Sequence, residues 1–320
     1  MKLRLGDIQI RDPFVLTLPE SQDYLLFGST DNNIWSGPAT GFDCYRSRDL
    51  VFWEGPFPAF RPQAEFWSHE QYWAPEVHEY QGRFFMFATF TAAGRFRGTQ
   101  ILSAVRPEGP YSPWSVGPAT PKNWQCLDGT LHVDAEGTPW MVFCHEWKQV
   151  HDGAMMAQRL SSDLRSAVGS PFFLFSASEA AWARPLDIPS AKDLEFPAYV
   201  TDGPYLSRLS SGNLIMLWSS FGDHGYAMGI ARSESGTVLG PWVQEAEPLW
   251  NTDGGHGMIA RTLDGRLFLT LHQPNISPNE RAGVYPLREM DDTVVLASTG
   301  DGDLPAEKPR VDTTRRQDKD

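Results

Sequence analysis

Cysteine is scarce in this chain, and its scarcity excludes several kinds of protein. The three cysteines, Cys44, Cys126 and Cys144, are odd in number and follow no metal-ligand spacing. A disulfide framework and a zinc module are therefore not expected. We expect three buried free thiols, as in proteins of a reducing compartment.

Positive charge and long apolar runs are also lacking. The chain has 27 Lys and Arg against 40 Asp and Glu, a net charge of −13, which argues against nucleic acid or an anionic membrane as a partner. No apolar run approaches the ~20 residues of a membrane span, and residues 1–7 lack the apolar core of a signal peptide. We expect a cytoplasmic protein that binds a neutral or cationic small molecule.

Turn-forming and aromatic residues are abundant instead. The 28 Gly, 25 Pro and 12 Trp are typical of a folded, β-rich protein with large rings between packed sheets. No Ser/Gly linker divides the 320 residues. We expect one domain over residues 1–300, followed by a charged, disordered tail over residues 301–320.

The chain contains five imperfect copies of an antiparallel unit. The clearest copy has an apolar strand over residues 214–218, joined by a Ser-Ser-Gly turn to an earlier strand that begins near Asp202. Similar units begin near residues 11, 72, 127 and 255. Repeats at this spacing indicate sheets arranged around an axis, so we predict an all-β, five-bladed β-propeller. Residues 172–198 depart from the pattern and are expected to form a loop over one face.

A polar residue stands at the start of the first strand in four copies, and a large β-sandwich, the alternative fold, would not predict this recurrence. These residues are Asp12, Asp128, Asp202 and His256. The first strand of each blade lines the axis, so matched register would bring the four side chains to one mouth of the channel. Like charges gathered in a partly dry cleft repel one another, and such clusters mark functional sites.

The five blade starts resemble those of glycoside hydrolase family 43. The motifs are Arg11-Asp12-Pro13, Trp73-Ala74-Pro75-Glu76-Val77, Leu127-Asp128-Gly129, Asp202-Gly203-Pro204 and Gly255-His256-Gly257. The resemblance covers residues 10–290. It implies a five-bladed propeller that hydrolyses arabinose- or xylose-containing glycans with inversion of configuration.

The same resemblance implies a role for each polar residue. Asp12 would be the general base, Asp202 the general acid, and Asp128 the residue that raises the pKa of the acid. An inverting glycosidase needs its acid and base about 6.5–9.5 Å apart, which leaves room for water. No cofactor is required, although His256 matches a histidine that in some relatives helps to hold a calcium ion through waters.

One position departs from the family pattern. The acid is usually Glu before Gly-Pro, and the shorter Asp202 would hold its carboxyl about 1.5 Å farther back. An error of that size can reduce the rate about 100-fold. If Asp202 is not the donor, Glu146 is the first substitute acid and Glu195, on the expected loop, is the second.

Three further residues are candidates for binding the sugar. Trp73 resembles the platform of the family's sugar subsite, and Trp35 would wall the cleft or pack within its loop. Glu76 would accept hydrogen bonds from sugar hydroxyls or hold a neighbouring loop in place.

The favoured function is an inverting exo-glycosidase, an α-L-arabinofuranosidase or β-xylosidase, that acts on short oligosaccharides. A glycoside phosphorylase is the first alternative, but it would need several Arg or Lys residues at the channel mouth, where only Arg11 is in register. A sugar-binding propeller without activity is the second alternative.

Overall fold

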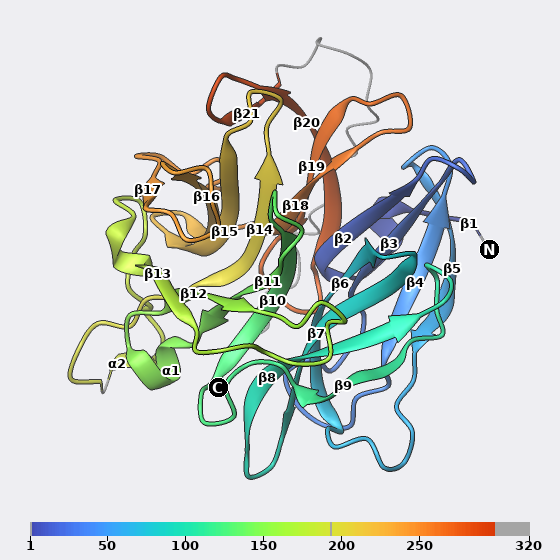
Figure 1. Cartoon of the computed structure of the whole chain (residues 1–320), viewed down its shortest axis with the longest axis horizontal. Coiled ribbons are helices and arrows are strands. Elements are labelled where there is room, and N and C mark those ends of the chain that lie inside the picture. The colour runs from blue at the N-terminus through green and yellow to red at the C-terminus, as the bar shows by residue number, and fades with distance from the viewer. Residues whose placement is uncertain (1, 193, 298–320) are drawn as a thin grey trace.

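The computed structural model describes residues 2–192 and 194–297. Five antiparallel sheets are arranged around a central axis, with β2, β6, β10, β14 and β18 nearest the centre (Figure 1). These five first strands contact one another in a closed ring. The predicted all-β, five-bladed propeller is therefore confirmed. The expected tail over residues 301–320 lies outside the described residues.

Each blade follows the order of the chain from the axis outward. Blade one contains β2 (Arg11–Leu18), β3 (Asp23–Ser29), β4 (Phe42–Ser47) and β5 (Phe52–Phe60), with β1 (Lys2–Arg4) paired beyond β5. Blade two contains β6 (Glu70–Tyr80), β7 (Arg83–Ala92), β8 (Arg95–Ala104) and β9 (Ser112–Pro118). Blade three contains β10 (Cys126–Val133), β11 (Pro139–His145), β12 (Ala154–Arg159) and β13 (Phe172–Ser176).

The last two blades have the same plan. Blade four contains β14 (Asp202–Arg208), β15 (Leu214–Gly222), β16 (Gly225–Ser233) and β17 (Trp242–Gln244). Blade five contains β18 (Gly255–Arg261), β19 (Leu267–Gln273), β20 (Arg281–Glu289) and β21 (Val294–Leu296). Short helical turns lie between strands as η1 (Leu5–Asp7), α1 (Trp147–Val150), η2 (Ala177–Glu179) and α2 (Pro189–Lys192).

The second strands form the apolar core of the blades. Leu214 to Trp218 on β15 is fully buried, as a continuous apolar run predicts for a strand covered on both faces. Cys44, Cys126 and Cys144 are all buried and free, which confirms the expectation from their number. Within the described residues, no helix is long and apolar enough to cross a membrane.

The expected loop over residues 172–198 is partly corrected. Its first five residues form β13, because Phe172 to Ser176 pair with β12 as the outer strand of blade three. Farther along this segment, Trp182 packs on blade four, where its ring lies 4.8 Å from the Trp218 ring. A Cβ added to Gly229 would lie 2.3 Å from the Trp182 ring, so the glycine makes room for this anchor.

Each blade begins with a β-bulge that points side chains at the axis. Register between the first and second strands shifts after Arg11, Trp73, Leu127, Asp202 and Gly255. The next residue has a positive φ in every blade: Asp12 at 52°, Ala74 at 46°, Asp128 at 56°, Gly203 at 50° and His256 at 46°. Such bulges redirect side chains and are frequent beside active sites.

The predicted position of Asp202 at the same register as Asp12 and Asp128 was wrong by one residue. Asp202 pairs with Ser219 as Arg11 pairs with Ser29, so it precedes the bulge residue instead of occupying that position. In blade four the left-handed position belongs to Gly203, which adopts a positive φ without a Cβ penalty. Asp12, Asp128 and His256 are in matched register, and Asp202 is one residue earlier.

Candidate active site

The bulges bring the predicted polar residues to one cavity at the channel mouth. Asp12, Asp128, Asp202 and His256 all line this cavity, whose volume is about 450 Å³. All four belong to first strands, which explains how residues more than 240 positions apart in the sequence meet.

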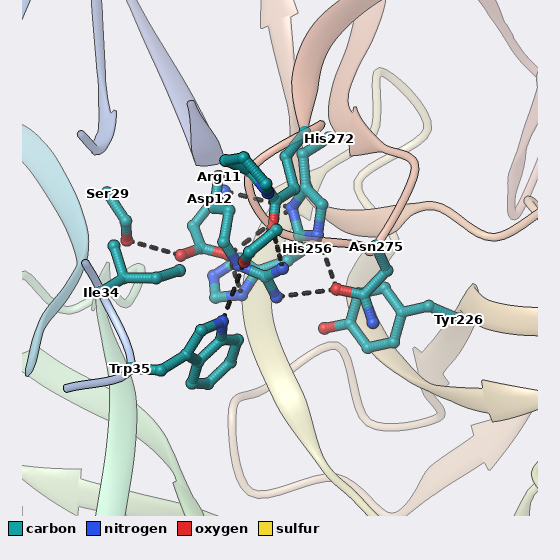
Figure 2. A network of polar contacts seen from close by, with 12 residues as sticks. Arg11, Asp12, Ser29, Ile34, Trp35, Tyr226, His256, His272 and Asn275 are labelled. Carbon is teal, nitrogen blue, oxygen red and sulfur yellow. Dashed lines mark hydrogen bonds and ion pairs between the residues drawn. The ribbon is translucent and has the colours of Figure 1, made fainter. Parts of the chain in front are cut away.

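His256 lies between two of the carboxylates. Its Nδ1 is 3.1 Å from Asp12 Oδ1 and 3.7 Å from Asp128 Oδ2. The other oxygen of Asp12 accepts a hydrogen bond of 2.6 Å from the Ser29 hydroxyl (Figure 2). Asp128 Oδ2 also accepts the backbone N–H of Gly203 at 3.1 Å. The cavity floor is therefore a connected polar cluster.

Asp12 is surrounded by groups that favour its charged form. Burial alone would raise the pKa of its carboxyl, but the charges of His256 and Arg11 oppose this effect. The Ser29 hydroxyl adds to the opposition, and the pKa of Asp12 falls below its ordinary value. Asp12 is consequently a carboxylate at neutral pH and can accept a proton.

Asp202 and Asp128 have the opposite character. Burial raises the pKa of Asp202 to about 7, and the charge of Asp12 adds to the effect, against a hydrogen bond of 2.9 Å from Tyr226 Oη. Burial also raises the pKa of Asp128 well above its ordinary value, with the charges of Asp202 and Asp12 adding to it. Asp202 and Asp128 therefore share a retained proton near neutral pH, whereas Asp12 is ionised.

A second polar network supports Asp12 from blade five. The His272 ring is fully buried, and its Nδ1 accepts the Asp12 backbone N–H at 3.1 Å. Arg11 donates to Glu280 Oε1 at 2.8 Å and to Asn275 Oδ1 at 2.7 Å (Figure 2). Sequence reasoning missed His272, Asn275 and Glu280, because they lie on or after the second strand of blade five and belong to no blade-start motif.

Trp35 and Trp73 form one wall of the cavity. Their rings meet edge to face at 5.3 Å, and Trp73 donates its indole N–H to Ile34 O at 2.7 Å. The Arg97 guanidinium lies 4.0 Å from the centre of the Trp73 ring. Trp35 is held through its indole N–H to Ser277 Oγ at 2.8 Å. The structure brings both predicted tryptophans to the site as a braced aromatic surface.

The other predicted residues differ in position. Glu76 is buried but is not among the cavity-lining residues, and it contacts His78 Nε2 at 3.1 Å on its own strand. Glu195 is exposed and also does not line the cavity. Glu146 does line it, but its oxygens pair with Arg97 Nη1 at 2.8 Å and Lys148 Nζ at 3.3 Å. Each oxygen of Glu146 therefore has a cationic partner.

The calcium ion implied near His256 gains no further support. The described residues contain no group of three or more His, Cys, Asp or Glu side chains placed to hold a metal ion. His256 Nδ1 already faces two carboxylates, and the expectation of a metal beside this residue stays a prediction.

Comparison with known proteins identifies the family. Residues 7–290 match the model described as glycosyl hydrolases family 43. The chain belongs to glycoside hydrolase family 43. Enzymes of this family invert the configuration of the bond they hydrolyse, so the chain is placed among inverting glycoside hydrolases.

Individual family 43 relatives are moderately similar. An endo-arabinase from Bacteroides thetaiotaomicron has 41% sequence identity and a TM-score of 0.83, over 91% of this chain and 98% of that chain. The extracellular exo-α-(1→5)-L-arabinofuranosidase ArbA of Cellvibrio japonicus is 24% identical over 303 residues, covering 85% of this chain and 81% of that protein. An exo-1,5-α-L-arabinanase from a bovine ruminal metagenomic library shares the fold, with a TM-score of 0.64, 19% identity, and 91% and 97% of the two chains covered.

Proposed function

We propose that this family 43 enzyme hydrolyses α-L-arabinofuranosyl bonds at the ends of short arabino-oligosaccharides. The observation that carries the proposal is the split in protonation within one cavity. Asp12 has a lowered pKa, whereas burial raises the pKa of Asp202 to about 7. A site with an ionised carboxylate and a protonated carboxyl has both the base and the acid of an inverting glycosidase.

The proposed reaction uses each group once. The Asp12 carboxylate takes a proton from water, whose oxygen forms a bond to the anomeric carbon. The bond from that carbon to the leaving oxygen breaks, and the Asp202 carboxyl gives its proton to the leaving oxygen. Asp128, whose pKa burial also raises, shares the retained proton with Asp202 and the His256 ring with Asp12.

Asp202 is favoured over the substitute acids despite its short side chain. Tyr226 holds one of its oxygens at 2.9 Å, which leaves the other for the leaving group. Glu146 is engaged by two cations, and Glu195 is exposed and does not line the cavity. The proposal therefore assigns the proton to Asp202.

Arabinose is favoured as the sugar by the names of two relatives, one an endo-arabinase and one an exo-arabinofuranosidase. The cavity of about 450 Å³ is near the low end of the ~300–1,000 Å³ typical of ligand pockets, which supports a short substrate and exo cleavage. Endo cleavage is the second candidate, because the Bacteroides relative carries that name.

Phosphorolysis is disfavoured by the cations of the cavity. Arg11 pairs with Glu280 at 2.8 Å and Lys148 pairs with Glu146 at 3.3 Å, so the Arg and the Lys that line the described cavity already have anionic partners. A phosphate group would compete with these carboxylates.

The test is hydrolysis of linear α-1,5-arabino-oligosaccharides, with product size followed by chromatography and the first-formed anomer followed by NMR. We expect arabinose as the earliest product, released with inverted configuration. Internal fragments as the earliest products would establish endo cleavage, and turnover of β-xylosides alone would replace arabinose by xylose.

The base is tested in the same assay by Asp12→Asn. We expect a loss of at least about 100-fold in kcat, the usual contribution of a general base. The matched control is Asp291→Asn, which makes the same change at an exposed residue of blade five. Near-normal turnover by Asp12→Asn would refute the assigned mechanism.

A further inference from the structure

We propose that Asn275 binds substrate by donating a side-chain N–H to a hydroxyl of the arabinosyl residue in the cavity. Asn275 lies in the loop between β19 and β20, is half-buried, and lines the same cavity as Asp12 and Asp202. The proposal deepens the proposed function and rests on its substrate class.

The orientation of the Asn275 amide is determined by Arg11. The guanidinium Nη2 is 2.7 Å from the amide atom assigned as Oδ1. A guanidinium has only donors, so its partner must be an acceptor, and in an amide the oxygen is the only acceptor. The usual ambiguity between the oxygen and nitrogen of an asparagine side chain does not arise here.

His272 independently requires the same orientation. Its Nδ1 accepts the Asp12 backbone N–H at 3.1 Å, so the ring proton is on Nε2. Nε2 lies 3.2 Å from Asn275 Oδ1 and donates to it. Burial lowers the pKa of His272 to about 3, which keeps the ring neutral with one proton. Two donors from two elements therefore hold the same amide oxygen.

The amide nitrogen is consequently left over. No hydrogen bond is made by Nδ2 within residues 2–192 and 194–297, and Figure 2 shows it directed away from Arg11 and His272. A rigidly held donor that faces a sugar-sized cavity needs an acceptor there, because a bound ligand would exclude the water that otherwise satisfies it. A pentose offers hydroxyl oxygens as acceptors.

The arrangement also links substrate binding to the base. The amide oxygen of Asn275 accepts a hydrogen bond from His272 Nε2, and His272 Nδ1 accepts one from the Asp12 backbone N–H. A sugar hydroxyl placed by Asn275 is therefore positioned relative to the atom that activates water. Asn275 acts by binding the sugar, with no proton transfer of its own.

The experiment is a double-mutant cycle in which the Asn275 amide is removed from the protein and single hydroxyls are removed from the substrate. Wild type and Asn275→Ala are assayed with 4-nitrophenyl α-L-arabinofuranoside and with its 2-deoxy, 3-deoxy and 5-deoxy analogues. We expect one deoxy analogue to lose about tenfold in kcat/KM with wild type and at most about twofold with Asn275→Ala, as for one neutral hydrogen bond. Equal penalties in both proteins, for all three analogues, would overturn the inference.

Two further variants separate binding from folding. Asn275→Asp keeps an acceptor for Arg11 and His272 but has no amide N–H donor. If Asn275→Ala does not fold, the deoxy analogues are assayed with Asn275→Asp instead. Asn279→Ala removes an exposed asparagine of the same loop, and its deoxy penalties should equal those of wild type. If wild type hydrolyses only xylosides, the arabinose proposal fails, and the same cycle with deoxy-xylosides supports or overturns the role of Asn275.

Discussion

The interface between blades three and four differs from the other four interfaces around the axis. At those four, the bulge N–H of one blade donates to a side chain on the second strand of the preceding blade. The bonds run from Ala74 to Ser29 Oγ, from Asp128 to Thr89 Oγ1, from His256 to Ser219 Oγ and from Asp12 to His272 Nδ1. Each acceptor pairs with the residue before its own blade's bulge.

Cys144 occupies the corresponding position in blade three, where it pairs with Leu127. A thiol is a weak acceptor, and burial raises the pKa of Cys144 so that it stays neutral. The N–H of Gly203 turns instead to Asp128 Oδ2, at 3.1 Å. Four interfaces therefore join blades through structural side chains, and the fifth joins them through a candidate catalytic carboxylate.

The difference shows that the N–H of a β-bulge can either join two blades or hold a carboxylate of the candidate site. At four interfaces, Ser, Thr and His acceptors join the blades, so no carboxylate is needed to accept the bulge N–H there. Replacing one acceptor by Cys144 commits the Asp128 carboxylate to the backbone beside Asp202. The proton-holding pair is thereby built at the only blade start with glycine at the bulge.

Removal of the carboxyl at this interface should have the largest effect. Asp202→Asn is expected to lose about 10²–10⁴-fold in kcat on arabino-oligosaccharides, the usual contribution of a general acid. The loss should be far smaller on the 4-nitrophenyl glycoside, whose leaving group needs little protonation. Glu146→Gln and Glu195→Gln serve as comparison variants, and the same leaving-group pattern in either would move the acid away from Asp202.

A side chain at the bulge glycine should have the next largest effect. A Cβ on Gly203 would lie 2.6 Å from the His256 ring, at a φ of 50°. We expect Gly203→Ala to lower the free energy of unfolding by about 2–4 kcal/mol, from left-handed strain plus overpacking. The control is Gly212→Ala, also at positive φ but in open space, which should lose about 1–2 kcal/mol. If urea denaturation gives the same loss of unfolding free energy for both variants, the contact with His256 does not contribute.

Loss of the Tyr226 hydroxyl should shift the pH dependence. An acid acts when protonated, so kcat/KM should fall as the pH rises through the pKa of Asp202, which is about 7. The Tyr226 hydroxyl lowers that pKa by donating to the carboxylate at 2.9 Å. In Tyr226→Phe, the fall of kcat/KM with rising pH (the falling limb of the pH profile) should therefore occur about one pH unit higher. A limb that does not move would mean that another group controls it.

Restoring the missing acceptor in blade three should have the smallest effect. In Cys144→Ser the hydroxyl can accept the Gly203 N–H, as Ser219 accepts that of His256. Asp128 would lose a donor and hold the shared proton more strongly, so Asp202 would be less often protonated. We expect about a threefold lower kcat/KM at its plateau, because Asp202 holds the shared proton less often. The pH at which kcat/KM falls should rise slightly, because the pair as a whole binds its proton more tightly. Cys126→Ser, at a buried thiol that does not line the cavity, should leave the limb unchanged.

The sequence by itself determined the repeats and the identity of the acidic residues. Apolar second strands such as Leu214 to Trp218 and the glycine-containing turns have local patterns, so the five blades can be counted along the chain. The polar blade starts are visible for the same reason, because each stands at a fixed place in a repeat.

Only the tertiary structure decided which atoms meet. The shift of Asp202 by one residue depends on the bulge at Gly203, and a bulge is set by pairing between strands. Asn275 and Tyr226 reach the cavity, and His272 reaches the Asp12 backbone, from later strands and loops where no local pattern marks them. The pairing of Glu146 with Arg97, 49 residues away, is likewise invisible in the sequence. Protonation and hydrogen bonding depend on neighbours in space, and the closed ring of blades makes those neighbours distant in sequence.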